Sequence, residues 1–289
     1  MTHIAVLGPG AVGCTLTAWL MQNRSLHVTV LARSPLAGIE VRAPDRVLSV
    51  SPRVITQPSA LPAFDWVLVT TKAYDSAAAA AWLAPLADSG ASVAVLQNGV
   101  EHIQRFEGFF PRARLLPVMV DIPADRIAPG RVTQHRHGCM VVPAGNLGAR
   151  FETLFGGMPI SVSQSADFTT EAWRKLCLNA AGAFSAVVSK PAGIASHEGV
   201  AALMASLIRE GIAVGRAEGA VLDESLVQDI VQASRSNPDA VNSMLADRLA
   251  GRPMEVDARN GVIARLGRRH GIATPMNDLV VALLQACQL

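Results

Sequence analysis

The pattern of apolar residues changes near residue 165. Before that point, short runs of apolar and β-branched residues recur between polar or glycine-containing stretches, and such runs predict buried strands. From Asp167 onward, apolar residues recur at i, i+3, i+4 and i+7 over long segments, which predicts helices with one buried face. We therefore expect two domains, residues 1–165 and residues 166–289.

Strands and helices alternate in the predicted first domain. The apolar runs that predict its strands lie at 3–8, 26–32, 66–71, 92–97 and 115–120. Helical sequence lies at 10–23, at 74–87 and in a short segment from residue 99 onward, whereas the sequence after the second run is rich in turn residues. This alternation predicts parallel strands joined by crossover helices. The later runs at 130–142 and 158–163 have no long helix between them, so we expect a mixed end to the sheet.

The predicted second domain is all helical. Its periodic segments lie at 168–189, 197–219, 223–234, 239–250, 254–270 and 275–287. Gly271 follows the last turn of one segment, and Thr274 and Pro275 occupy the N-cap and first helical positions of the next. The expected architecture is thus an α/β domain followed by a helical domain.

The composition excludes several classes of protein. Half of the 289 residues are hydrophobic, and a net charge of +2 gives no electrostatic reason to expect nucleic acid or a membrane surface as a partner. The four cysteines are far apart and form no CxxC pair, so neither a zinc site nor a disulfide framework is expected. The N-terminus lacks the features of a secretory signal, and no segment approaches the roughly 20 apolar residues of a membrane span. We expect a soluble cytoplasmic protein.

A glycine-rich segment, IAVLGPGAVG, joins the first predicted strand to the first predicted helix. Gly8 suits a tight turn, Gly10 lets the backbone approach a pyrophosphate, and Gly13 lets the helix pack closely on the strand. The helix N-terminus, at Ala11 and Val12, would then face the phosphates. We interpret the segment as a dinucleotide-binding loop; the alternative is a glycine-rich turn with only a structural role.

The end of the second strand indicates which dinucleotide binds. NAD-binding proteins place an acidic residue there for the ribose 2′-OH, whereas this chain has Arg33 and Ser34 and no acidic residue before Glu40. A guanidinium suits a 2′-phosphate, so NADP is favoured over NAD. The alternative is that Arg33 is a solvated surface residue.

Two further strands end in polar residues. Lys72 follows one and Asn98 and Gly99 follow another, at the carboxyl ends where ligands of open α/β sheets lie. Taken alone, Lys72 is equally compatible with a surface lysine, and Asn98 and Gly99 are equally compatible with an Asn-Gly turn. Their shared location favours a role in ligand binding.

A lysine and an asparagine share one face of the helix predicted at 168–189. Lysine is rare here, because only Lys72, Lys175 and Lys190 occur among the 25 Lys and Arg residues, and Asn179 lies one turn after Lys175. The Lys175 ammonium could polarise a carbonyl and donate a proton to its oxygen, or its stem could simply cover apolar surface.

An ammonium in a cleft requires a counter-charge. The segment NSMLADRLAGRPMEVDARNG supplies Ser243 and then Glu255, just after Pro253 at a predicted helix N-terminus. The alternative for Glu255 is a capping role alone.

These segments together resemble the ketopantoate reductase (2-dehydropantoate 2-reductase) family over the whole chain. The matching segments, in chain order, are GPGAVG, TTKAYD, LQNGV, WRKLCLN, SML and MEVDARNG. Each is weak evidence by itself, but all of them in the family's order are specific. The resemblance implies an α/β Rossmann domain that binds NADPH, followed by an all-helical domain like those of the 6-phosphogluconate dehydrogenase superfamily, with the active site in the cleft between them.

The resemblance also implies a reaction and its residues. The reaction is the NADPH-dependent reduction of 2-dehydropantoate to pantoate, a step of pantothenate and coenzyme A biosynthesis, and it needs no metal. Lys175 would be the catalytic acid and Glu255 its acidic partner. The substrate would be bound by Asn98, Lys175, Asn179 and Ser243. The cofactor would be bound by Gly8, Gly10, Ala11, Val12, Gly13, Arg33, Lys72, Asn98 and Glu255.

The chain departs from the family at three positions. Ala183, Gly193 and Ala240 stand where the best-known members have asparagines in the substrate pocket. Each lost hydrogen-bonding group would weaken recognition of a hydroxylated substrate by about 1 kcal/mol or more. The reduction of a 2-oxo acid is therefore better supported than the identity of that acid.

Other interpretations remain open at this point. A β-hydroxyacid dehydrogenase also uses a KxxxN helix but usually carries a GxMG loop, which is absent here, and a catalytically idle NADP-binding protein is disfavoured because Lys175 and Glu255 are both present. His135 and His137, two apart on a predicted strand, lack a third metal ligand in the sequence pattern, so an exposed strand edge is the preferred interpretation. The protein could be a monomer or a homodimer.

Overall fold

The computed structural model describes residues 1–288, at Ala60 for the backbone only, and divides into two compact units. The first unit comprises Met1–Gln97 and Glu101–Phe168. The second comprises Asn98–Val100 and the chain from Thr169 onward. The segment Asn98–Val100 therefore belongs with residues far from it in the sequence, a feature that the hydrophobic pattern did not predict.

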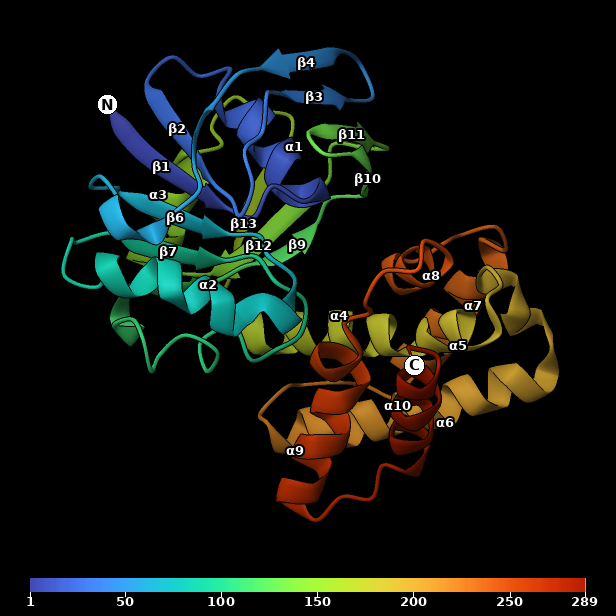
Figure 1. The fold of residues 1–289 in the computed structure, drawn as a ribbon. Helices are drawn as coiled ribbons and strands as arrows, with labels where there is room; N and C mark the ends of the chain where they lie inside the picture. Colours follow the sequence, from blue (N-terminus) through green and yellow to red (C-terminus); the bar gives the residue numbers. More distant parts are fainter. Residues whose placement is uncertain (289) are drawn as a thin grey trace. The chain divides into compact units, whose positions relative to one another are not determined.

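The core of the first unit is a parallel sheet (Figure 1). In the part of the chain that the structure describes, six strands pair in the order β5-β2-β1-β6-β7-β8, each parallel to its neighbours. Their bounds are Thr2–Leu7 (β1), Leu26–Leu31 (β2), Arg53–Ile55 (β5), Trp66–Val69 (β6), Ser92–Val95 (β7) and Leu115–Pro117 (β8).

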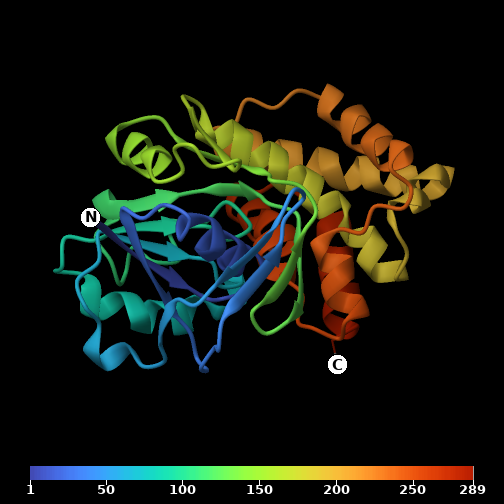
Figure 2. The same cartoon turned by 90° about the horizontal axis from the view of Figure 1, so that it is seen from above.

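Both faces of this sheet are buried, which explains the continuous apolar runs in the sequence. Successive side chains of a strand point to opposite faces, so Ile4 and Val6 join one core cluster and Ala5 and Leu7 the other. Helix α1 (Ala11–Leu20) supplies the first cluster and α2 (Ser76–Leu83) the second. Figures 1 and 2 show α2 along one side of the strands.

The predicted mixed end of the sheet is wrong. Strand β8 is an edge strand, and Val118 donates its N–H to Val95, so the nitrogen of Pro117 faces the open edge, where proline is tolerated and no further strand is added. The later strands form separate sheets instead. One also contains two early strands, β3 and β4, and has the order β10-β11-β3-β4, with bounds Ala124–Ala128, Arg131–Gln134, Ile39–Arg42 and Val47–Val50. The other has the order β13-β12-β9, with bounds Ser161–Ser165, Cys139–Pro143 and Met119–Asp121.

The short helix expected from residue 99 is also wrong. Gly99 has a φ of +99°, in the left-handed region, so no right-handed helix begins there. The chain then forms irregular turns, with bonds such as Arg105 N–H to Glu101 O and Phe110 N–H to Phe106 O.

Helix α3 (Asn146–Thr153) was not predicted. The remaining short 3₁₀ turns are Pro58–Ala60, Ala73–Asp75, Ala84–Leu86 and Arg112–Arg114.

The second unit is helical. Its helices are α4 (Phe168–Ala181), α5 (Ala183–Val188), α6 (Glu198–Ala217), α7 (Ser225–Ser236), α8 (Ser243–Leu249), α9 (Val262–His270) and α10 (Pro275–Ala286). A 3₁₀ turn covers Ala192–Ser196 and a π-helical turn covers Asp257–Gly261, directly before α9. The segment predicted as one helix over 168–189 is divided at Gly182, whose carbonyl accepts a bond from the Asn242 side chain at 2.9 Å.

Glycines and buried amides hold this helical unit together. A Cβ at Gly215 of α6 would lie 2.9 Å from the Trp173 ring of α4, so these helices need glycine to pack this closely. Glu210 of α6 accepts the N–H of Met276 and two bonds from Asn277, which connects α6 to the start of α10. These bonds satisfy the polar groups that the helix ends bury.

A helix that crosses a bilayer must be both long enough and apolar along its length. Across residues 1–288, none meets both requirements.

Thiol reactivity tests the two cores. Burial raises the pKa of the Cys14 thiol to about 11 and that of the Cys177 thiol to about 12, whereas Cys287 is exposed. Because the thiolate is the nucleophile, we expect iodoacetamide at neutral pH to modify Cys287 well before Cys14 or Cys177 in the folded protein. Peptide mass spectrometry over time measures this, and all three should react quickly in denaturant. Equal rates in the folded protein would contradict the described packing.

Candidate active site

The glycine segment forms a tight turn between β1 and α1. Gly8 has a φ of +97°, and its carbonyl accepts a bond from the Thr70 hydroxyl at 2.7 Å. A Cβ at Gly13 would lie 2.2 Å from that same carbonyl, so α1 can approach β1 only with glycine there. A Cβ at Gly10 would meet no protein atom within 4 Å. The turn is therefore closed against the strand and open at Gly10.

The N-terminus of α1 is free of side-chain capping. Gly10 is the N-cap residue and supplies no side chain, so no cap hydrogen bond reaches the first turn, which includes Ala11 and Val12. Backbone N–H groups of a helix start attract phosphate oxygens. Together with the open position at Gly10, this geometry fits a pyrophosphate and hence a dinucleotide.

Arg33 and Lys72 follow the carboxyl ends of β2 and β6, the two strands that flank β1. The Arg33 side chain is 80% exposed, and its Nη1 lies 3.8 Å from Asp75 Oδ1. Lys72 is partly buried and stands at the N-cap of the short turn Ala73–Asp75. These cations and the glycine turn lie at the same edge of the parallel sheet.

Gln97 organises this edge, and the sequence analysis did not identify it. The side chain is only 5% exposed, and its Nε2 donates to Thr71 Oγ1 at 3.0 Å and to the Lys72 carbonyl at 3.3 Å. The Ser76 hydroxyl and Arg105 donate to its Oε1. A single buried amide thereby fixes the backbone on which Lys72 is mounted. The only sequence signal was a polar residue directly after the run VAVL.

In the second unit, Asn98 contacts Glu255. The Asn98 Nδ2 donates to Glu255 Oε2 at 2.9 Å, across 157 positions of sequence. Glu255 is only 5% exposed and directly precedes Val256, the first helical residue before the π-helical turn. Such turns are rare and often lie at functional sites. The amide that ends the LQNGV segment and the carboxylate of MEVDARNG thus meet in one place.

Lys175 and Asn179 lie one turn apart on α4, and both are half-buried. The fully packed face of this helix is formed by other residues, among them Trp173, Leu176 and Cys177. Lys175 therefore does not belong to the apolar core face. Its pairing with Glu255 stays a prediction.

Ser243 is the first residue of α8 and is exposed. Asn242 before it caps the helix by accepting the N–H groups of Met244 and Leu245. The Ser243 Oγ accepts a bond of 2.6 Å from Nη2 of Arg259, a residue of the π-helical turn. The sequence analysis did not identify Arg259, because nothing in the local pattern distinguishes a buried arginine from a surface one.

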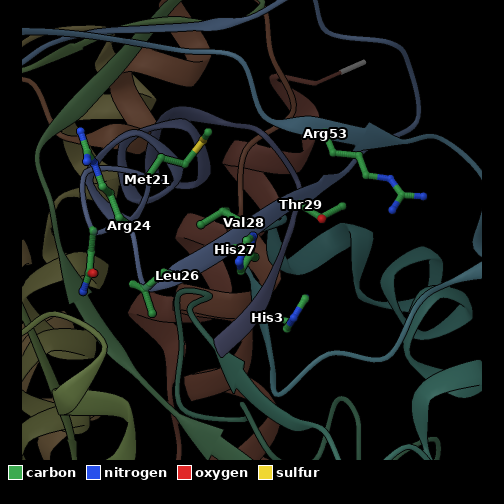
Figure 3. A pocket seen from close by; sticks show the side chains of 9 residues that line it. His3, Met21, Arg24, Leu26, His27, Val28, Thr29 and Arg53 are labelled. Carbon is green, nitrogen blue, oxygen red and sulfur yellow. The ribbon is translucent and has the colours of Figure 1, made fainter. Parts of the chain in front are cut away.

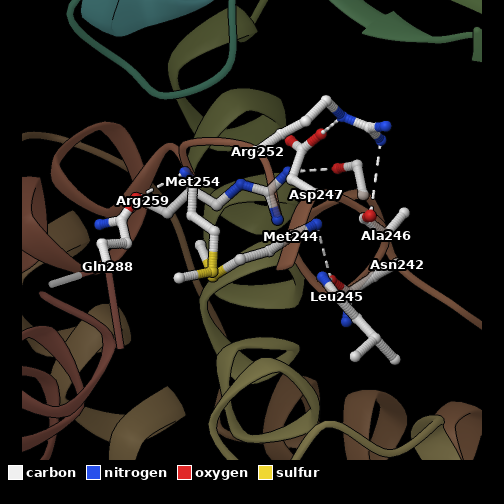
Figure 4. Close-up of polar contacts among 10 residues, drawn as sticks. Asn242, Met244, Leu245, Ala246, Asp247, Arg252, Met254, Arg259 and Gln288 are labelled. Atoms are coloured by element: carbon white, nitrogen blue, oxygen red, sulfur yellow. Dashed lines mark hydrogen bonds and ion pairs between the residues drawn. The ribbon is translucent and has the colours of Figure 1, made fainter. Parts of the chain in front are cut away.

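Arg259 is only 2% exposed. Burial lowers the pKa of its guanidinium below the usual value, and the charges of Glu255 and Asp247 act in the opposite direction. Figure 4 shows the Arg259 guanidinium pointing towards the α8 segment that carries Met244 and Asp247. An arginine keeps its proton even when buried, so this is a fixed positive charge inside the helical unit.

The three departures from the family pattern have distinct environments. Ala183 is fully buried. A Cβ at Gly193 would lie 3.1 Å from Pro238, so an asparagine there would press on that residue. Ala240 accepts the backbone N–H of Ala192 at 3.0 Å. None of the three positions contributes a polar side chain.

The two histidines do not lie on a strand, so that placement is wrong. Strand β11 ends at Gln134, His135 lies in the bend that follows it, and His137 lies in the irregular segment after that bend. His135 lies 2.7 Å from Asp125, and the His137 ring packs edge-on against Trp19. Among the residues described, no three or more His, Cys, Asp or Glu side chains are grouped so that they could hold a metal ion.

A cavity of about 340 Å³ lies at the opposite edge of the sheet (Figure 3). His3, His27, Thr29 and Arg53 help to line it, and they belong to β1, β2 and β5. Ligands of open α/β sheets bind outside the carboxyl ends of the strands. The cavity is lined by His3, near the start of β1, and by Arg53, the first residue of β5, so we do not assign the dinucleotide to it.

Comparisons with known proteins agree with the sequence motifs. The family model described as "Ketopantoate reductase PanE/ApbA" matches residues 4–146, and its C-terminal counterpart matches residues 167–288. A 2-dehydropantoate 2-reductase of Caulobacter vibrioides is 53% identical over 290 residues, covering 100% of both chains.

Solved structures give the same result. The crystal structure of a PanE/ApbA family ketopantoate reductase from Ralstonia eutropha superposes with a TM-score of 0.91 at 29% identity, over 99% of this chain and 98% of that one. A ketopantoate reductase of Staphylococcus aureus, described as dimeric, has a TM-score of 0.88 at 26% identity, over 99% and 98% of the chains. With a Rossmann-like α/β domain and a helical C-terminal domain, the chain belongs to the ketopantoate reductase family, whose members are oxidoreductases that act on CH–OH and C=O groups.

Proposed function

We propose that this protein reduces 2-dehydropantoate (ketopantoate) to pantoate with NADPH, a step of pantothenate and coenzyme A biosynthesis. The observation that carries the proposal is the 2.9 Å bond between Asn98 and Glu255, which unites two of the family's motif residues in a chain that matches the family along its length. The chain would act in the cytoplasm as a monomer or a homodimer. The dimeric relative supports the second possibility.

NADPH, when bound, supplies the hydride. The glycine turn at Gly8, Gly10 and Gly13 and the first turn of α1 would hold its pyrophosphate. Arg33 and Lys72 would hold the 2′-phosphate and neighbouring phosphate charge, because both follow strands adjacent to β1. The high exposure of Arg33 leaves its guanidinium accessible to such a ligand.

Lys175 would polarise the C2 carbonyl of the substrate and donate a proton to its oxygen as the carbon receives hydride. Glu255 would counterbalance the ammonium, and the bond from Asn98 keeps this buried carboxylate oriented. Asn179, one turn after Lys175, and the exposed Ser243 would bind polar groups of the substrate.

A second candidate function is the reduction of a different 2-oxo acid by the same residues. The observation that favours it is the absence of polar side chains at Ala183, Gly193 and Ala240. A panel of 2-oxo acids decides between the two candidates. The proposed function requires that kcat/KM be highest for ketopantoate.

Removal of the proposed acid should abolish turnover. We expect Lys175→Ala to lower kcat by about a thousandfold, the range that a positioned proton donor supplies, while NADPH still binds. Loss of NADPH absorbance with ketopantoate measures the rate. Lys190→Ala, which changes an exposed lysine, is the matched control and should behave like wild type. An active Lys175→Ala enzyme would rule out the proton-donor role.

Two glycine substitutions should separate cofactor binding from folding. Gly10→Ala adds a methyl group where no protein atom lies within 4 Å, so the melting temperature should be unchanged while NADPH binding weakens about tenfold or more. Gly13→Ala forces a clash with the Gly8 carbonyl and should destabilise the fold by about 1–3 kcal/mol. Thermal unfolding and cofactor titration measure both effects. Tight NADPH binding by Gly10→Ala would argue against the dinucleotide loop.

The cofactor preference should depend on Arg33. We expect wild type to bind NADPH more tightly than NADH, and Arg33→Ala to weaken NADPH binding about tenfold while NADH binding is unchanged, since only NADPH carries the 2′-phosphate. Arg24→Ala removes another exposed arginine of the same unit and serves as the control. Equal affinities of wild type for both cofactors would overturn the preference for NADPH.

A further inference from the structure

A buried arginine stands behind an exposed serine in the helical unit. Arg259 is 2% exposed, Ser243 is exposed, and the guanidinium Nη2 donates to the serine Oγ at 2.6 Å. Ser243 was assigned to the substrate site from its motif, whereas Arg259 belongs to no assigned site. The pair therefore connects a buried charge to a surface hydroxyl.

The positive charge of Arg259 is balanced within the unit. Glu255, which is 5% exposed, and Asp247 both act electrostatically on the guanidinium, and Asp247 also accepts a bond of 2.9 Å from Arg252. The Arg259 Nε–H is buried and has no hydrogen-bond partner within the described residues. A group with an unsatisfied donor does not recover its full desolvation cost as stability. Stabilisation of the fold is thus a poor explanation for a buried arginine at this position.

The bond fixes the direction of the Ser243 hydroxyl. A serine O–H can donate or accept, but a guanidinium has donors only, so Ser243 must accept from Arg259. The single hydroxyl hydrogen then points away from the guanidinium. Because the serine is exposed, that hydrogen is presented to a ligand, and the adjacent cation strengthens it as a donor. An anionic acceptor is the ligand chemistry that fits it.

We propose that Arg259 is a positioning residue that orients and polarises the Ser243 hydroxyl so that it binds the carboxylate of the 2-oxo acid substrate. The inference rests on the proposed function and names the residue that gives the Ser243 subsite its preference for an anion. Arg259 is too deeply buried to touch the substrate, so it acts through Ser243. Lys175 acts on the carbonyl of the substrate, whereas Arg259 acts on its carboxylate through Ser243. Experiments can therefore distinguish the two roles.

The test is a double-mutant cycle measured with ketopantoate and NADPH. Arg259→Lys keeps a positive charge beside Glu255 and Asp247 but loses the geometry of the guanidinium, and Ser243→Ala removes the hydroxyl. We expect each to raise KM about tenfold, the factor of one charge-assisted hydrogen bond, while kcat changes by less than about threefold. The double variant should have the same KM as Ser243→Ala, because Arg259 then has nothing through which to act.

Inhibition by the product tests the charge. We expect the inhibition constant of pantoate to rise about tenfold in Arg259→Lys, and that of its uncharged primary amide to stay unchanged. Arg252→Lys is the matched control, since it alters the other guanidinium near Asp247 without touching Ser243, and its KM should equal that of wild type.

Several outcomes would overturn the inference. One is that the effects of Arg259→Lys and Ser243→Ala on KM multiply in the double variant. Another is that Arg259→Lys lowers the melting temperature while leaving KM unchanged, which is the behaviour of a purely structural residue. A wild-type enzyme that turns over no ketopantoate would instead reject the proposed function, and that result is seen before any variant is made.

Discussion

The burial of one carboxylate, that of Glu255, constrains the candidate site residues of the helical unit. Glu255 is almost inaccessible to solvent, and a buried carboxylate is unfavourable unless hydrogen bonds and positive charge compensate it. Asn98 supplies a hydrogen bond and Arg259 supplies charge. Removing one partner of such a group typically costs about 3–5 kcal/mol, so these residues depend on one another. Through Arg259 the same constraint reaches the Ser243 hydroxyl.

The bond between Asn98 and Glu255 coincides with a change of unit along the chain. Residue 97 belongs to the first unit and residues 98–100 to the second, so the transition occurs at a single peptide bond. Gln97 uses its side chain to hold the backbone of Lys72, and Asn98 uses its side chain to hold Glu255. The side-chain amides of two consecutive residues thus hold different groups.

In the first unit the main constraint is steric rather than electrostatic, because the Gly8 carbonyl leaves no room for a side chain at Gly13.

The sequence predicted what depends on local periodicity. Strands β1, β6 and β7 are buried on both faces, so they appear as nearly continuous apolar runs, and the helical unit shows its period over long segments. Strands β3 and β4 are short and half-exposed, which gives no such run. The helix expected from residue 99 failed because Gly99 adopts a left-handed conformation. Gln97 and Arg259 escaped notice for another reason: their burial and their partners are set by tertiary packing, which local sequence does not encode.

Under the proposed function, two kinds of contact would bind the substrate, and its identity would depend on the weaker kind. Every 2-oxo acid carries the same carboxylate and carbonyl, and these would be bound by charged or charge-polarised groups, Lys175 and the Ser243 hydroxyl backed by Arg259. Discrimination between acids rests on neutral hydrogen bonds to the remaining polar groups, each worth about 1 kcal/mol net. Ala183, Gly193 and Ala240 supply none of these, and the first is fully buried. Under the proposed function, the arrangement would therefore favour 2-oxo acids as a class more strongly than it would distinguish ketopantoate from its analogues.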